Sequence, residues 1–126
     1  MVLTTRGRRS GFPRMTAIEH RRFGEEHYIV SAWGSKADWY RNILKDPRVG
    51  VWAGRRKFSG VAEILNLDEK REALRKRWGD NEFKVIRSLF RLNFNPTEEQ
   101  MNALLNRVKV LRIRPLKNMQ AKAERF

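Results

Sequence analysis

The chain of 126 residues contains no cysteine, which excludes disulfide bonds, thiolate nucleophiles and cysteine-ligated zinc or iron–sulfur sites. Only two imidazoles are present, His20 and His27, and their spacing matches no metal-binding motif, so we expect two exposed histidines and no metal site. No apolar run reaches about 18 residues, the length that spans a membrane. No apolar segment follows the start as in a secretory signal. These absences predict a cytoplasmic protein.

Acidic residues are also scarce, because 14 aspartates and glutamates stand against 28 lysines and arginines, giving a net charge of +14. Such an excess predicts an anionic partner: nucleic acid, acidic lipid headgroups or a polyanionic small ligand. The chain length and a hydrophobic fraction of 40% indicate one domain with a core. We assign residues 1–116 to that domain and residues 117–126 to a basic C-terminal tail.

The most informative stretch is the basic turn, residues 4–14, with the sequence TTRGRRSGFPR. Gly7 and Gly11 permit positive φ values and let a ligand approach the backbone closely. Arg8 and Arg9 present planar donor forks suited to phosphate or carboxylate, and Ser10 adds a hydroxyl. The composition therefore predicts an oxyanion-binding loop between two strands, although a basic turn of this kind is also typical of a solvated loop.

Hydrophobic periodicity and turn signals predict a mainly β protein with helical insertions, of the α+β class. Strands are expected over residues 1–6, 14–22, 27–33, 49–53, 57–65 and 108–116, and helices over residues 38–45, 67–78, 83–92 and from 98 to 106. Ser35 and Asp38 have the spacing of a capping box at the first helix. Because a strand leads directly into this helix, its N-terminus is expected to form a second anion site.

Two segments carry a resemblance to a known family: GRRSGFPR at residues 7–14 and YIVSAWGSKADWYRNILKDPRV at residues 28–49. Together they resemble the signature segments of the deazaflavin-dependent nitroreductases, enzymes with a split β-barrel, flavin-reductase-like fold that use the reduced coenzyme F-420. The resemblance covers about half of the chain. It implies an oxidoreductase that transfers hydride to a small-molecule acceptor, namely a quinone, a nitro compound or an activated enone.

The resemblance also assigns roles to residues. The phosphate and carboxylate tail of the coenzyme would contact the basic turn and the strand that follows it, through Arg8, Arg9, Ser10, Arg14, Met15 and Thr16. The deazaflavin ring would lie near Ser31, Ala32, Trp33 and Gly34, and the far wall would be formed by Asp38, Trp39, Tyr40 and Asn42. Ser31 and Tyr40, with Tyr28 behind them, are the candidate catalytic donors for charge that develops on the acceptor.

Other functions stay open at this point. Related split barrels bind flavin mononucleotide (FMN), which is the alternative cofactor. A non-enzymatic module that binds nucleic acid or an acidic membrane would also explain the net charge. Nucleic acid is the less favoured partner, because the basic residues of the second half lie on amphipathic helices whose other faces resemble core. Dimerisation and peripheral membrane association are not decided by the sequence, and neither is the role of residues 66–106.

Overall fold

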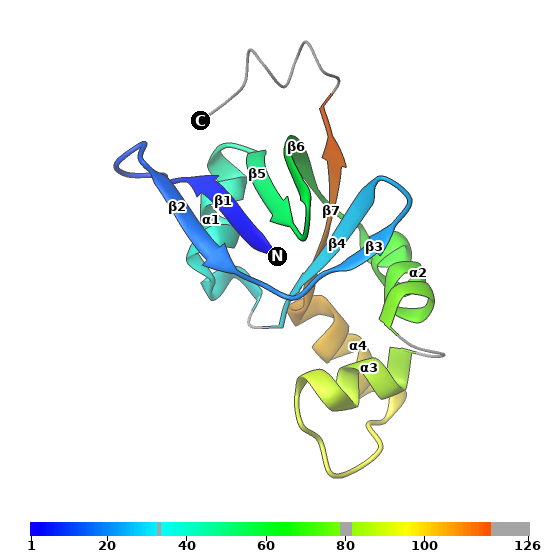
Figure 1. Cartoon of the computed structure of the whole chain (residues 1–126). Helices are drawn as coiled ribbons and strands as arrows, with labels where there is room; N and C mark the ends of the chain where they lie inside the picture. The colour runs from blue at the N-terminus through cyan, green and yellow to red at the C-terminus, as the bar shows by residue number, and fades with distance from the viewer. Residues whose placement is uncertain (33, 79–81, 117–126) are drawn as a thin grey trace.

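The computed structural model describes residues 1–32, 34–78 and 82–116 (Figure 1). Its strands are β1 (Val2–Arg6), β2 (Pro13–Ala17), β3 (Arg21–Phe23), β4 (Glu26–Ser31), β5 (Arg48–Ala53), β6 (Arg56–Ile64) and β7 (Lys109–Pro115). Its helices are the short 3-10 helix η1 (Gly34–Lys36) and the α-helices α1 (Asp38–Lys45), α2 (Leu67–Trp78), α3 (Glu82–Leu89) and α4 (Glu98–Arg107). The predicted α+β class with a predominant sheet is confirmed.

All seven strands belong to one antiparallel sheet in the order β2-β1-β5-β6-β7-β4-β3. The two edge strands, β2 and β3, are consecutive in the chain and are joined by residues 18–20. A flat sheet of this size would separate its edges by about 29 Å, whereas the connection spans at most about 15 Å. The sheet must therefore curl until its edges approach each other, as Figure 1 shows.

Two apolar clusters pack on opposite faces of the sheet. On one face, α1 contributes Tyr40 and Ile43 to a cluster that includes Ile29 of β4. On the other face, α2, α3 and α4 pack against Tyr28 and Val110. β4 is thus buried on both faces, as its apolar sequence predicts. Among the described residues no helix is long and apolar enough to cross a membrane.

The prediction of a single strand over residues 14–22 is wrong, because this segment contains most of β2 and the start of β3. β2 pairs with β1, and the Ile18 amide continues the pairing by donating to the Met1 carbonyl at 3.0 Å. The chain then crosses to the opposite edge, where β3 pairs with β4. The helices predicted over residues 38–45 and 67–78 are confirmed as α1 and α2.

The predicted capping box at α1 is also wrong. Ser35 lies in η1, and the N-cap of α1 is Ala37, whose side chain makes no capping hydrogen bond. The cause is Gly34, which has φ +62° and lies so close to α4 that a Cβ atom would be 2.6 Å from the Arg107 carbonyl oxygen. A 3-10 turn begins at Gly34, so Ser35 precedes the N-cap, and α1 begins at Asp38 as predicted.

Candidate functional site

The basic turn is a tight loop that connects β1 to β2. The Gly7 amide donates to the Phe12 carbonyl at 2.8 Å, and the Gly11 amide donates to the Gly7 carbonyl at 2.8 Å. Gly11 has φ +77°, a positive value of the kind that the sequence predicts at this glycine. Gly7 serves a different purpose, because a Cβ atom there would lie 2.8 Å from Ser10 Oγ. Ser10 Oγ in turn accepts a hydrogen bond from the Phe12 amide at 3.1 Å, so part of its hydrogen-bonding capacity is used inside the loop.

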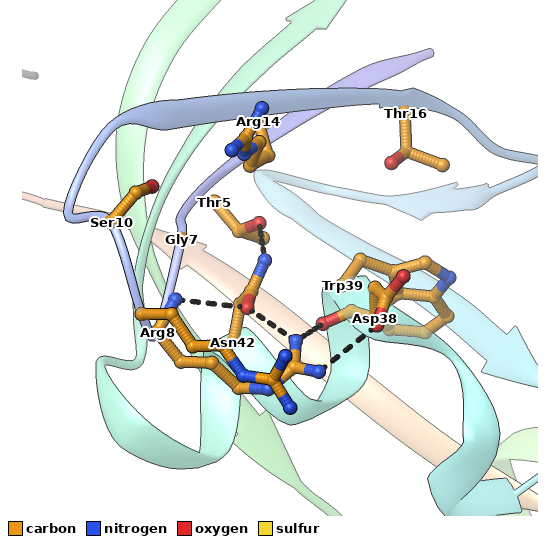
Figure 2. Close-up of a pocket in the computed structure, with 10 residues that line it drawn as sticks. Thr5, Gly7, Arg8, Ser10, Arg14, Thr16, Asp38, Trp39 and Asn42 are labelled. Atoms are coloured by element: carbon orange, nitrogen blue, oxygen red, sulfur yellow. Dashed lines mark hydrogen bonds and ion pairs between the residues drawn. The ribbon is translucent and has the colours of Figure 1, made fainter.

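A cleft of about 430 Å³ lies between β2 and the N-terminal half of α1 (Figure 2). Arg14 and Thr16 enter it from β2, while Asp38 and Trp39 form the opposite wall on α1. Eight residues predicted for the cofactor site line it: Arg8, Arg9, Ser10, Arg14, Thr16, Asp38, Trp39 and Asn42. Thr5 and Gly7 also line the cleft and were not predicted as site residues.

Arg8 is held firmly by α1. Its guanidinium donates to Asn42 Oδ1 at 2.9 Å and to Asp38 Oδ1 at 3.1 Å (Figure 2). Its backbone amide also donates to Asn42 Oδ1, at 3.1 Å, and its carbonyl accepts from Lys45 Nζ at 2.8 Å. Lys45 was not predicted to take part in the site, although the spacing of Asp38, Asn42 and Lys45 places the three on one helical face.

Arg9 and Arg14 differ from Arg8. Both side chains are exposed and line the cleft, and within the described part of the chain neither forms an ion pair or a side-chain hydrogen bond. Asp38 is the single acid among the residues that line the cleft, and it lies 3.1 Å from Arg8. The cleft therefore has a net positive charge with two guanidinium groups available to an anion.

Residues 1–85 match the family model of the F420H2-dependent quinone reductases. The chain belongs to this family. F420H2 is the reduced form of coenzyme F-420, so F-420 is the cofactor, as the sequence predicts, in place of the alternative FMN. The family assignment agrees with the resemblance to deazaflavin-dependent enzymes.

The family model covers residues 1–85, and solved structures are similar to this F420H2-dependent quinone reductase family member over most of its chain. A pyridoxamine 5′-phosphate oxidase-like protein from Listeria innocua shares 16% identity at a TM-score of 0.60, with 92% of this chain and 82% of that chain covered. A conserved hypothetical protein from Mycobacterium tuberculosis shares 25% identity at a TM-score of 0.56, with 92% and 72% covered. An F420H2-dependent reductase shares 19% identity at a TM-score of 0.59, with 89% and 90% covered. These likenesses confirm the split β-barrel fold. No curated protein matches the sequence.

The cleft fits the cofactor of the F420H2-dependent quinone reductases. A tail that bears phosphate and carboxylate groups requires cationic donors that the protein does not already use, and Arg9 and Arg14 meet this requirement. Trp39 is half-buried and offers an apolar wall beside them. The fit thus rests on residues of the basic turn, of β2 and of α1.

Several predicted site residues lie away from this cleft. Met15 is 74% exposed and points to the opposite face of β2 from Arg14 and Thr16, because side chains alternate along a strand. Ala32 is half-buried and does not line the cleft, and Trp33 lies outside the described residues. Gly34 is buried against the C-terminal end of α4.

The two predicted catalytic donors are both buried. Ser31 is 4% exposed, and its hydroxyl donates to the Gly34 carbonyl at 2.8 Å. Tyr40 is 5% exposed and belongs to the apolar cluster under α1, where burial raises the pKa of its hydroxyl. Tyr28 donates to Glu26 Oε1 at 3.2 Å on the far side of the sheet. None of the three lines the cleft.

The histidines also differ from the prediction of two exposed side chains. His20 is half-buried and His27 is 1% exposed, with ring centroids 4.9 Å apart. Arg56 approaches His27 Nε2 at 2.8 Å, and because a guanidinium only donates, Nε2 must be the acceptor and the proton must be on Nδ1. Burial, reinforced by the positive charge of neighbouring groups, lowers the pKa of His27 to about 4, so its imidazole is neutral at pH 7.

Proposed function

We propose that this protein catalyses the transfer of hydride from F420H2 to a quinone, with nitro compounds and activated enones as further acceptors. The observation that supports the proposal most strongly is the cleft between β2 and α1. There, Arg9 and Arg14 are available to an anion and have no side-chain partner in the described residues. The family to which the chain belongs reduces quinones with the same reductant.

Each wall of the cleft would have a separate role in binding the cofactor. Arg9 and Arg14 would hold the anionic tail through charge-assisted hydrogen bonds. Trp39 and the neighbouring helix wall would bound the apolar part of the cofactor and exclude water from it. When bound, F420H2 would supply the hydride itself, so the protein contributes mainly binding and orientation.

A donor for the charge that develops on the acceptor remains a proposal. Ser31 would have to release the Gly34 carbonyl to act, and Tyr40 would have to leave the apolar cluster under α1. Both moves cost buried contacts, and neither side chain lines the cleft. Cytoplasmic location likewise remains a prediction from the sequence, which leaves dimerisation and association with an acidic membrane open.

Binding of oxidised F-420, followed by its fluorescence at two salt concentrations, tests the proposal, with FMN titrated in parallel. Replacing one charge-assisted contact in Arg9→Ala is expected to weaken F-420 binding by about 10- to 100-fold. The matched control is Arg55→Ala, which removes the same charge from an exposed turn between β5 and β6. Because Trp52 pairs with Val2, that turn lies beyond the opposite end of β1 from the basic turn.

Turnover completes the test. Oxidation of F420H2 is expected with a quinone, a nitro compound and an activated enone as separate acceptors, and the rates rank the three classes. Absence of saturable F-420 binding in the wild-type protein would overturn the proposal. Equal losses in Arg9→Ala and Arg55→Ala would show that general charge, and not the cleft, governs binding.

A further inference from the structure

We propose that Arg8 does not contact the coenzyme but docks the basic turn on α1, and that Asn42 and Thr5 are positioning residues that keep Arg9 and Arg14 aimed into the cleft. The inference rests on the proposed function. It gives Arg8 a different role from Arg9 and Arg14, although the sequence predicts all three as cofactor contacts. It concerns Arg8 and Thr5, which both form hydrogen bonds with the buried side chain of Asn42 (Figure 2).

Arg8 uses every kind of polar group it has on α1. Its guanidinium contacts Asp38 and Asn42, its backbone amide donates to Asn42 Oδ1, and its carbonyl accepts from Lys45 Nζ. These contacts fix the backbone of the turn at the residue before Arg9. A guanidinium already opposed by a carboxylate at 3.1 Å gains less from a second anion than a guanidinium without a partner.

Asn42 is the centre of this arrangement and is 3% exposed. Its Nδ2 group donates to Thr5 Oγ1 at 3.0 Å, and its Oδ1 atom accepts two hydrogen bonds from Arg8. Since Arg8 offers only donors at these positions, Oδ1 must face Arg8 and the amide nitrogen must face Thr5. The hydroxyl of Thr5, which is 1% exposed on β1, therefore fixes the orientation of the amide.

The consequence is a mechanical link from β1 through α1 to the basic turn. Thr5 orients Asn42, Asn42 holds Arg8, and the position of Arg8 sets where Arg9 begins. Arg14 lies directly opposite Thr5 in the pairing of β1 with β2, so the same point also locates the second available arginine. Losing the link is expected to displace the anion contacts without removing any charge.

A double-mutant cycle between Asn42→Leu and Arg9→Ala tests the link, with binding of oxidised F-420 measured at two salt concentrations. Asn42→Leu carries no charge change, yet it is expected to weaken binding about tenfold and to lower the salt dependence of binding, as Arg9→Ala does. The two losses are expected to be less than additive, because both act through Arg9. Additive losses together with an unchanged salt dependence in Asn42→Leu would overturn the proposal.

Thr5 provides a second pair of variants that are milder than the asparagine replacement. Thr5→Val keeps the shape but leaves Asn42 Nδ2 without its acceptor, whereas Thr5→Ser keeps the hydroxyl. We expect weaker F-420 binding and reduced salt dependence in Thr5→Val and near wild-type values in Thr5→Ser. Equal behaviour of the two variants would contradict a positioning role for the hydroxyl.

A ligand-free measurement separates this inference from the proposed function. Hydrogen exchange of the Arg8 amide in the free protein is expected to be about tenfold faster in Asn42→Leu and in Thr5→Val than in the wild type. Unchanged exchange would overturn the docking role, whatever the cofactor. Failure of the wild-type protein to bind F-420 would overturn the proposed function, and the exchange rates would still decide whether Asn42 docks the turn.

Discussion

Two adjacent arginines, Arg8 and Arg9, have the same side chain and different surroundings. The polar groups of Arg8 form hydrogen bonds with residues of α1, whereas Arg9 lines the cleft without a side-chain partner among the described residues. The residue type predicts an affinity for anions in both cases, but the neighbours decide which of them is available. The same holds for Ser31, whose hydroxyl is used by the Gly34 carbonyl.

Gly34 gives a prediction about stability at the residue scale. Gly34→Ala is expected to destabilise the fold by roughly 2–4 kcal/mol, because the residue has φ +62° and its Cβ would lie 2.6 Å from the Arg107 carbonyl oxygen. Gly24→Ala is the matched control, since Gly24 has φ +61° and open space around a Cβ. Only the backbone penalty of about 1–2 kcal/mol is expected there. Urea unfolding of both variants measures the difference, and equal losses would rule out the close contact as the cause.

The buried His27 is expected to make the free energy of unfolding depend on pH. Its pKa is about 4 in the folded protein and is near 6.5 when unfolded, so the unfolded chain binds more protons between these values. Keeping this imidazole neutral costs the folded state almost nothing well above pH 6.5, but stability falls by about 3 kcal/mol as the pH drops to 4. His27→Gln keeps an acceptor for Arg56 but does not titrate. Unfolding free energies measured from pH 7 to pH 4 should therefore fall less steeply in the variant than in the wild type.

At the scale of elements, the sequence predicts a helix or strand correctly where residues close together in the chain determine the structure. α2 follows from Asp68 near its start and the basic residues toward its end, and the helix that ends at residue 45 is stopped by Asp46 and Pro47. The signals fail where distant residues decide. The chain leaves β2 after Ile18 because it must reach the other edge of the sheet, and Ser35 does not cap α1 because a 3-10 turn begins at Gly34, which packs against Arg107.

Thr97, which caps α4, and Ser35, which was predicted to cap α1, make this contrast measurable. At α4, Thr97 Oγ1 accepts from the Gln100 amide at 3.2 Å and the Gln100 side chain accepts from the Thr97 amide at 3.0 Å, forming a capping box. Thr97→Ala is expected to cost about 1 kcal/mol of stability. Ser35→Ala is expected to cost less than about 0.5 kcal/mol, since Ser35 is exposed and does not cap α1. Equal losses on thermal or urea unfolding would show that Ser35 has a role that the geometry does not reveal.

At the scale of the molecule, the sequence predicts the curled sheet and the cofactor better than the site itself. The two signature segments and the basic turn contribute nine of the ten residues that line the cleft, and the site itself stays a prediction. What the sequence does not show is which groups face one another. Thr5 and Lys45 lie in these segments, but the sequence assigns them no role, because they contact residues 37 positions away.

The basic tail gives a prediction for the whole chain. A chain ending at residue 116 retains the complete sheet through β7, and the cleft is formed by residues from Thr5 to Asn42. Removing residues 117–126 is therefore expected to change F-420 affinity by less than about threefold and to leave the unfolding midpoint nearly unchanged. Circular dichroism and the fluorescence titration measure both. A large loss of either would place the tail within the functional unit.

The position of β7 has a consequence for how the protein is made. This strand is the last of the sheet to be synthesised, yet it lies between β6 and β4 and pairs with both. Until it leaves the ribosome, β6 and β4 each have an unpaired edge where the finished sheet is continuous, and such edges template aggregation. The N-terminal residues that form the cleft are translated first, but the sheet behind them is completed only once β7 has been synthesised.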